Sequence, residues 1–397
     1  MTQFSRLPQD RAAMKTMPAA RDDTLALNEL LPCGGCGAKV GSQPLHAALR
    51  DLRARFPQHA LPEGAQGEDV AILPPLSRPV QSIDTLRTMI DDPFLMGAIA
   101  AQHALSDIYA AGATPRAALA SVTLPFARDA LLRSDLEQVL AGALSVLADA
   151  DCPLLGGHSM QAAEGQVGFV ITAEAPLAGA LRCKRSGQAG DHLLLTKPLG
   201  SGVIFAAAMQ HQADGRVVGQ AVRQMRESNA VASRVATQWA LTAVTDVTGF
   251  GLLGHLVEML PDGVGAVIDP AAVPLVPGAL ELAVQGVRSS LWPANFAAVA
   301  PFLDADALPP LSAHPAITAD VVNGRDHGDA ERHGTADSLA RRALLLDPQT
   351  SGGLLMAVPA DHAHACLKAL QAAGLVAADI GRLRADPQQR VQFAPAA

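Results

Sequence analysis

The segment from Asp92 to Gly112 constrains the fold most, because it predicts a helix that is apolar on almost every side. Asp92 is a plausible N-cap, Pro93 occupies the first turn, and Gly112 ends the helix before Pro115. A helix of this kind must be buried on several faces at once. It nevertheless contains Asp107. Because an unpaired carboxylate is costly in apolar surroundings, we expect Asp107 to have a cation partner.

Strand-like and helix-like segments alternate along the rest of the chain, which indicates an α/β or α+β fold. We expect helices from Ser42, between residues 124 and 167, and near 220–240. We expect strands at 70–73, 80–83 (ending at Asp84), 117–124, 167–173, 192–196 and 243–248.

A polar stretch at 182–191 predicts a domain boundary. We therefore expect a mobile N-terminal arm at 1–32, an N-terminal domain at 33–181 and a C-terminal domain at 190–397. The segment at about 304–338 lacks periodicity and is expected to be a polar insertion. Its histidines could bind metal, although solvated loop histidines are the commoner case; they are His314, His327 and His333.

Composition excludes several classes of protein. Of the 397 residues, 49% are apolar and 17% charged, so general disorder is excluded. The net charge is −8 and only 3% of the residues are aromatic, which disfavours nucleic-acid binding. The five cysteines are an odd number spread over a long chain, so a reducing compartment is expected. We find no signal peptide and no run of about 20 apolar residues, and expect a cytoplasmic protein without a membrane segment.

Cys33 and Cys36 form a Cys-x-x-Cys pair, which can be redox-active, can supply half a zinc site, or can contain one reactive thiol. A structural zinc site needs four ligands, and the chain has no second pair. The third interpretation suits Cys36 best, because Lys39 and a helix N-terminus near Ser42 would both favour a thiolate. The spacing alone leaves a functional and a structural Cys36 equally open.

Four acids stand out: Asp69 heads a predicted strand, Asp84 ends one, Asp107 is in the apolar helix, and Asp246 lies within residues 244–248. Such carboxylates with few basic neighbours suit Mg²⁺, a hard cation that also takes phosphate oxygens. Structural ion pairs are the competing explanation, and the residues alone do not exclude it.

Glycine-rich segments at 155–159 and 347–353 could cradle phosphate, because glycine lets the backbone approach an anion closely. Either segment taken alone is more typical of an ordinary turn. A Gly-x-Gly-x-x-Gly run begins at Gly249, with Asp269 following 20 residues later. That spacing is a weak match to a dinucleotide-binding fingerprint.

Together these segments resemble the selenophosphate synthetase (selenide, water dikinase) family over roughly residues 33 to 385. Gly35-Cys-Gly-Ala-Lys39 is similar to the family's Gly-Cys-Gly-Cys-Lys, and Glu68-Asp-Val-Ala-Ile72 to its Asp-Asp-Ala-Ala-Val. The other segments that carry the resemblance are Asp91-Asp-Pro-Phe94, Ala104-Leu-Ser-Asp-Ile-Tyr-Ala110, Gly156-Gly-His-Ser159, Leu195-Thr-Lys-Pro-Leu-Gly200, Thr245-Asp-Val-Thr-Gly-Phe-Gly-Leu-Leu-Gly-His255 and Asp347-Pro-Gln-Thr-Ser-Gly-Gly-Leu-Leu355.

The resemblance implies a two-domain fold of the aminoimidazole ribonucleotide synthetase type, with ATP near a homodimer interface. It implies the Mg²⁺-dependent conversion of ATP, selenide and water to selenophosphate, AMP and phosphate. Cys36 and Lys39 would be catalytic, and Lys39 would also touch ATP. The remaining ATP-binding residues would be Gln66, Gly67, Glu68, Asp84, Asp107, Gly157, His158 and Ser159, the last three from the other subunit. The Mg²⁺ ligands would be Asp69, Asp107 and Asp246.

The chain departs from the family pattern at several positions. Ala38 replaces a Cys, Cys33 is additional, Gly67 stands where Arg is frequent, Glu68 replaces an Asp, and His103 stands where Asn is usual. The Cys-Gly-Gly-Cys opening resembles a divergent version that is found fused to a flavin oxidoreductase, so such an enzyme is a possible partner. The alternative functions are another ATP-dependent kinase or synthetase of this fold, or a non-catalytic selenium or sulfur carrier that uses Cys33 and Cys36.

Overall fold

A computed structural model describes residues 38–61, 70–177, 180–304 and 336–394. Two compact units divide the chain, residues 1–39 and 40–397, and the fold below is that of the second unit. Its first half contains α1 (Ser42–Arg55), β1 (Pro79–Arg87), α2 (Pro93–Ala110), β2 (Thr114–Pro125), α3 (Asp129–Asp149), β3 (Leu154–Ala162) and β4 (Gln166–Glu174).

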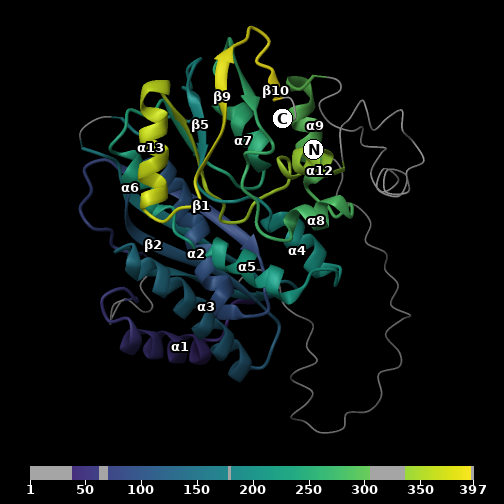
Figure 1. The fold of residues 1–397 in the computed structure, drawn as a ribbon. Coiled ribbons are helices and arrows are strands. Elements are labelled where there is room, and N and C mark those ends of the chain that lie inside the picture. The colour runs from purple at the N-terminus through teal and green to yellow at the C-terminus, as the bar shows by residue number, and fades with distance from the viewer. Residues whose placement is uncertain (1–37, 62–69, 178–179, 305–335, 395–397) are drawn as a thin grey trace, which may run out of the picture. The chain divides into compact units, whose positions relative to one another are not determined.

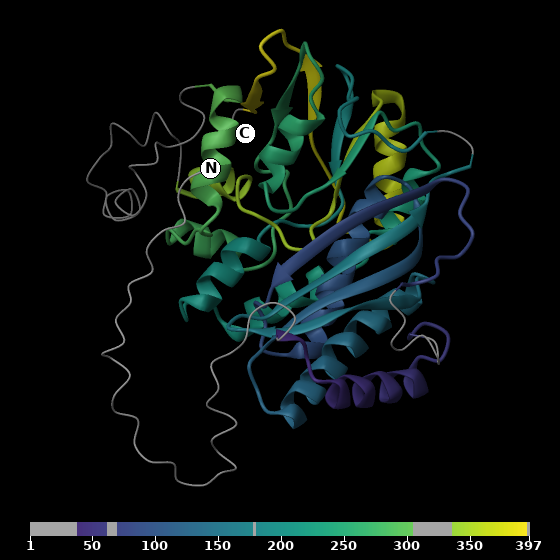
Figure 2. The ribbon, with the colours of Figure 1, turned by 180° about the vertical axis from the view of Figure 1, so that it is seen from behind.

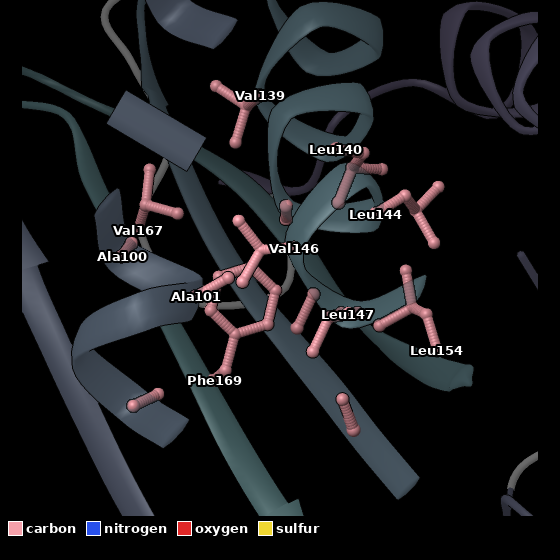
Figure 3. Close-up of a cluster of buried hydrophobic side chains, with 14 of the residues drawn as sticks. Ala100, Ala101, Val139, Leu140, Leu144, Val146, Leu147, Leu154, Val167 and Phe169 are labelled. Carbon is pink, nitrogen blue, oxygen red and sulfur yellow. The ribbon is translucent and has the colours of Figure 1, made fainter. Parts of the chain in front are cut away.

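The four strands of the first half form one sheet in the order β1-β4-β2-β3. β4 pairs antiparallel with β1 and β2, whereas β2 and β3 run parallel and are joined through α3. Helices α2 and α3 lie against this sheet, as Figure 1 shows, and Figure 2 gives the view from behind. Between these helices and the sheet lies a core of aliphatic side chains around Phe169, which is fully buried (Figure 3).

Two glycines let α2 and α3 approach each other closely. A Cβ atom added at Gly97 would lie 1.9 Å from the carbonyl oxygen of Val139, and one added at Gly142 would lie 1.9 Å from that of Phe94. These are backbone atoms of the facing helix, so no side-chain rotation can relieve the clash. The separation of the two helices therefore depends on both glycines.

The second half contains β5 (His192–Leu195), α4 (Ser201–Met209), α5 (Gly215–Met225), α6 (Ala230–Ala236), β6 (Ala243–Asp246), α7 (Gly251–Met259), β7 (Val264–Ile268), α8 (Ala279–Val284), α9 (Trp292–Val299), the 3₁₀ helix η3 (Ala300–Phe302), α12 (Ala336–Leu344), β8 (Leu354–Val358), α13 (Ala360–Ala372), β9 (Ala378–Ala385) and β10 (Val391–Phe393). Its six strands form a second sheet in the order β10-β7-β9-β5-β8-β6. All pairs in it are antiparallel except β10 with β7.

Helices cover both faces of this second sheet. Leu194 and Met356 pack on the side of α6 and α13, and Leu193 and Leu355 pack on the side of α7. All five residues of β8 are buried, as expected for a strand that is enclosed on both faces.

The predicted fold class is confirmed, and so are most of the predicted elements. The Asp92 carboxylate accepts a hydrogen bond from the Leu95 N–H at 2.9 Å, and α2 ends at Ala110, just before Gly112. The strands expected at 117–124, 167–173, 192–196 and 243–248 correspond to β2, β4, β5 and β6. The helix expected between residues 124 and 167 is α3, and the one expected from Ser42 is α1, although its N-cap is Gly41 and has no side-chain cap.

Four predicted elements were wrong. No strand forms at residues 70–73, where Val70 and Ile72 are largely exposed and two prolines follow. Strand β1 does not end at Asp84, because its pairing with β4 continues to Arg87. The glycine-rich segment 155–159 is part of β3 rather than a turn. The helix near 220–240 is two helices, α5 and α6, separated by residues 226–229.

The topology also contradicts the dinucleotide-binding interpretation of the glycine run after β6. Such a site needs two neighbouring parallel strands joined by the helix. Here β6 and β7, which flank α7, are separated in the sheet by β8, β5 and β9.

The domain limits at 32, 181 and 190 remain predictions. The proposed arm at 1–32 and almost all of the insertion at 304–338 lie outside the described residues. Among the helices that the structure describes, none combines the length and apolar character needed to cross a membrane.

Replacing Gly97 by Ala should destabilise the protein by about 2 kcal/mol or more, because the new methyl group meets the backbone of α3. Chemical denaturation monitored by circular dichroism measures the effect. Gly219→Ala is the matched control, since it lies in α5 with only the end of the Arg223 side chain within 4 Å. We expect it to be neutral or slightly stabilising. An equal loss in both variants would contradict the packing argument.

Candidate functional site

The charges of three aspartates, which lie in three different elements, interact with one another. Asp84 lies in β1, Asp107 is near the end of α2, and Asp246 is the last residue of β6. The carboxylates of Asp107 and Asp246 both raise the pKa of Asp84, and Asp107 also raises that of Asp246. The fold therefore brings acids from both halves of the chain into one group, which we call the acidic cluster.

Burial is the main cause of the raised pKa values in this cluster. Burial first, and repulsion from Asp107 and Asp246 second, raise the pKa of Asp84 to about 7. Burial and Asp107 raise the pKa of Asp246 to about 6, although a hydrogen bond from Ser106 and the charge of Lys184 act in the opposite direction. Ionising all three carboxylates is therefore unfavourable without an added positive charge.

The cation partner expected for Asp107 is not found among the described residues. Its Oδ2 accepts a hydrogen bond from Ser82 Oγ at 2.5 Å, and no described Lys or Arg forms an ion pair with it. Arg87 pairs instead with Glu164, and Lys184, whose charge acts on Asp246, pairs with Glu258. The structural ion pair that competed with a metal role is thus not formed within the described chain.

A hydrogen-bond chain connects α2 to the second half beside Asp246. Asn229 Nδ2 donates to Ser106 Oγ at 2.9 Å and to the Gly352 carbonyl oxygen at 2.9 Å. Ser106 is fully buried and hydrogen-bonds in turn to Asp246. Neither Ser106 nor Asn229 is among the candidate site residues predicted from the sequence. Serine inside an apolar helix is a weak signal for Ser106, but its partner is 123 residues away.

Lys197 is the other residue that sequence analysis passed over. Its side chain is buried, and Nζ donates to the carbonyl oxygens of Glu227 at 2.7 Å and Ser351 at 2.9 Å. Burial lowers the pKa of Lys197 to about 8, whereas the nearby charges of Glu227 and Asp246 favour its protonated form. Nothing in the sequence around Lys197 marks its side chain as buried, so only the tertiary structure identifies it as an internal cation.

The segment 347–353 stabilises a helix end. Gln349 Oε1 accepts from the Gly200 N–H at 2.8 Å and the Ser201 N–H at 3.1 Å, and Asp347 Oδ2 accepts from the Val203 N–H at 2.5 Å. These N–H groups belong to the start of α4. These contacts agree with an ordinary structural turn. The N–H groups at this helix end are occupied by Gln349 and Asp347, so the segment does not bind phosphate through them.

The remaining predicted site residues fall into two groups. Gly157, His158 and Ser159 lie on β3, at the edge of the first sheet, with Gly157 and His158 exposed. A Cβ at Gly157 would meet the Ala120 carbonyl oxygen at 2.2 Å, so close strand packing requires glycine there. Lys39 is exposed and belongs to the separate unit 1–39. Outside the described residues lie Cys33, Cys36, Gln66, Gly67, Glu68 and Asp69.

The donor set of the acidic cluster fits a hard divalent cation. Carboxylate oxygens are the ligands that Mg²⁺ prefers, and their mutual repulsion would be relieved by its charge. No three His, Cys, Asp or Glu side chains of the described residues lie close enough to hold a metal by themselves. The described residues alone therefore do not form a complete metal site, and Asp69 stays a predicted ligand.

Family comparisons identify the class of protein to which this fold and cluster belong. Residues 67–175 match the model for the N-terminal domain of AIR synthase related proteins, and residues 188–394 match that for the C-terminal domain. The chain is therefore a member of the AIR synthase-related proteins, as the resemblance implied.

Curated relatives narrow the family further. A selenide, water dikinase of Pelobacter propionicus is 34% identical over 375 residues, covering 93% of this chain and 99% of the relative. One of Myxococcus xanthus is 35% identical over 374 residues, covering 92% and 96%. The chain belongs to the selenide, water dikinase family.

Solved structures agree on the fold. Thiamine-monophosphate kinase from Stenotrophomonas maltophilia superimposes with a TM-score of 0.60 at 19% identity, covering 89% of this chain and 97% of that one. Escherichia coli HypE gives 0.60 at 18% identity, covering 89% and 94%.

Asp246→Asn should raise the melting temperature of the magnesium-free protein, because one member of a repelling group loses its charge. We expect a gain on the order of 1 kcal/mol, measured by scanning calorimetry in EDTA. Adding Mg²⁺ should then stabilise the variant less than the wild type. Asp262→Asn is the control: Asp262 is exposed and pairs with Arg185, so little change is expected. A lower melting temperature for Asp246→Asn in EDTA would contradict the argument.

Stability of the magnesium-free protein should also fall as pH rises from about 4 to about 7. The pKa of Asp84 is raised from 3.8 to about 7, so in this interval the folded state binds more protons than the unfolded state. Urea unfolding at several pH values in EDTA measures the slope. Asp84→Asn should flatten it, and an unchanged slope in that variant would assign the effect to other groups.

Proposed function

We propose that this protein is a selenide, water dikinase that converts ATP, selenide and water to selenophosphate, AMP and phosphate. The observation that carries the proposal is the 34–35% identity to enzymes of that name over more than 90% of the chain. The acidic cluster supports it, since phosphoryl transfer is catalysed mainly by positioning and charge neutralisation.

Magnesium is the cation that we assign to the acidic cluster. Asp107 and Asp246, together with Asp69, would hold it, and Asp84 would face the nucleotide. When bound, Mg²⁺ neutralises phosphate charge during transfer. Ser82 and Ser106 orient the two described ligands, because each donates a hydrogen bond to one carboxylate.

We assign the reactive thiol to Cys36 and its counter-charge to Lys39. A cation three residues away would favour the thiolate, and the same ammonium would meet ATP phosphates. Gln66, Gly67 and Glu68 would complete the nucleotide site on this subunit.

A homodimer is part of the proposal. The first sheet exposes Ile83 of β1, and the segment before it exposes Val70, Ile72 and Leu73. Exposed apolar residues on a sheet and in the segment that precedes it are consistent with an interface. Gly157, His158 and Ser159, on the edge strand of this sheet, would then reach the ATP of the partner subunit.

Anaerobic ³¹P NMR with Mg-ATP, with and without selenide, tests the function. We expect a new selenide-dependent phosphorus signal together with AMP and phosphate. Cys36→Ser should abolish that signal, whereas Cys183→Ser, at an exposed cysteine in the segment between the two sheets, should retain it.

Three outcomes would each overturn part of the assignment. ADP as the only nucleotide product would indicate another acceptor and therefore another kinase of this fold. No ATP turnover, with selenium still bound through Cys33 and Cys36, would favour the carrier. Full synthesis by Cys36→Ser would remove that thiol from the mechanism.

A further inference from the structure

His103 has a defined protonation pattern beside the acidic cluster. It lies on α2, one turn before Asp107, and is only 8% exposed. Its Nδ1 accepts a hydrogen bond from the Ser351 main-chain N–H at 3.2 Å. A main-chain N–H can only donate, so Nδ1 carries no hydrogen and a neutral ring has its hydrogen on Nε2.

Ser351 is fixed in the orientation that this contact needs. Its φ of +51° is unusual for a residue other than glycine, so its neighbours must hold it there. The buried Lys197 ammonium donates to its carbonyl oxygen. The ring of His103 is thus held by a segment that a buried cation anchors.

The free Nε2–H faces a carboxylate. His103 Nε2 and Asp84 Oδ1 are 3.8 Å apart, which is slightly longer than a hydrogen bond. Burial lowers the pKa of His103 to about 4, so the ring is neutral at neutral pH. The pair would come within hydrogen-bond range if this distance shortened by about 0.5 Å.

We propose that His103 is a positioning residue for the nucleotide site: its Nε2–H orients the Asp84 carboxylate that meets ATP. This inference rests on the proposed function. A neutral donor suits the place, because it orients a carboxylate without adding a positive charge that would compete with Mg²⁺.

Two substitutions separate positioning from structure. In His103→Asn the amide oxygen can replace Nδ1 as the acceptor for Ser351, but nothing replaces Nε2–H. In His103→Gln the longer amide can replace the Nε2 donor, but the acceptor for Ser351 is lost. His103→Asn therefore removes the positioning contact with Asp84, whereas His103→Gln removes the structural contact with Ser351.

The readouts are binding of a non-hydrolysable ATP analogue with Mg²⁺ by calorimetry, the melting temperature, and KM for ATP against kcat. We expect His103→Asn to melt close to the wild type and to bind the analogue about tenfold more weakly, with a matching rise in KM and a smaller change in kcat. His103→Gln should melt lower and bind more tightly than His103→Asn. In an Asp84→Asn background, His103→Asn should have no further effect on binding.

Wild-type binding by His103→Asn, or binding losses that follow the melting temperatures of both variants, would overturn the proposal. Ring ¹⁵N shifts, assigned from the signal missing in His103→Asn, should show hydrogen on Nε2; hydrogen on Nδ1 would also overturn it. Analogue binding needs no selenide. A wild-type protein that binds the analogue but makes no selenophosphate would therefore refute the proposed function and leave this test valid.

Discussion

The packing of α2 between the two halves of the chain is the constraint on which the site depends. This helix is buried along most of its length against α3 and the first sheet, yet His103, Ser106 and Asp107 project from it. The second half meets those side chains with hydrogen-bonding groups, through Ser351 for His103 and Asn229 for Ser106. The apolar faces of α2 fix its position, and its polar residues then determine what the neighbouring segments must provide.

The electrostatic consequence is an internal site that is acidic and short of counter-charge. Burial and mutual repulsion keep the carboxylates of Asp84 and Asp246 partly protonated near neutral pH. The buried ammonium of Lys197 gives its hydrogen bonds to backbone carbonyls and influences Asp246 only through its charge. A divalent cation together with a polyphosphate supplies the charges and the ligand oxygens that such an arrangement lacks.

Local signals in the sequence were sufficient to predict part of the fold. The cap at Asp92, the proline after it and the glycine beyond the helix act within a few residues, so α2 was predicted correctly. The sequence predicts a turn in the glycine-rich part of β3, but Gly157 is required there by the close approach of Ala120, which is distant in sequence. Segment 70–73 has the composition of a strand but gains no partner strand among the described residues.

The candidate site, like the fold, could be predicted from the sequence only in part. Asp107 could be selected from the sequence because it lies in an apolar helix, and Asp84 and Asp246 because they lie in or at the end of strand-like segments. The residues around them could not, because Asn229, Lys197 and Ser351 meet their partners through contacts between residues that are 123 to 248 positions apart in the chain.

Because the acidic cluster takes residues from both sheets, neither half of the chain is an independent module. A chimera that joined the first half to the second half of a relative would have to preserve Asn229 opposite Ser106 and Ser351 opposite His103. Recombination within this family should therefore tolerate exchanges on the outer helices far better than crossovers that separate α2 from the segments after β5 and β6. The residues on the two sides of this contact are therefore expected to have changed together during evolution.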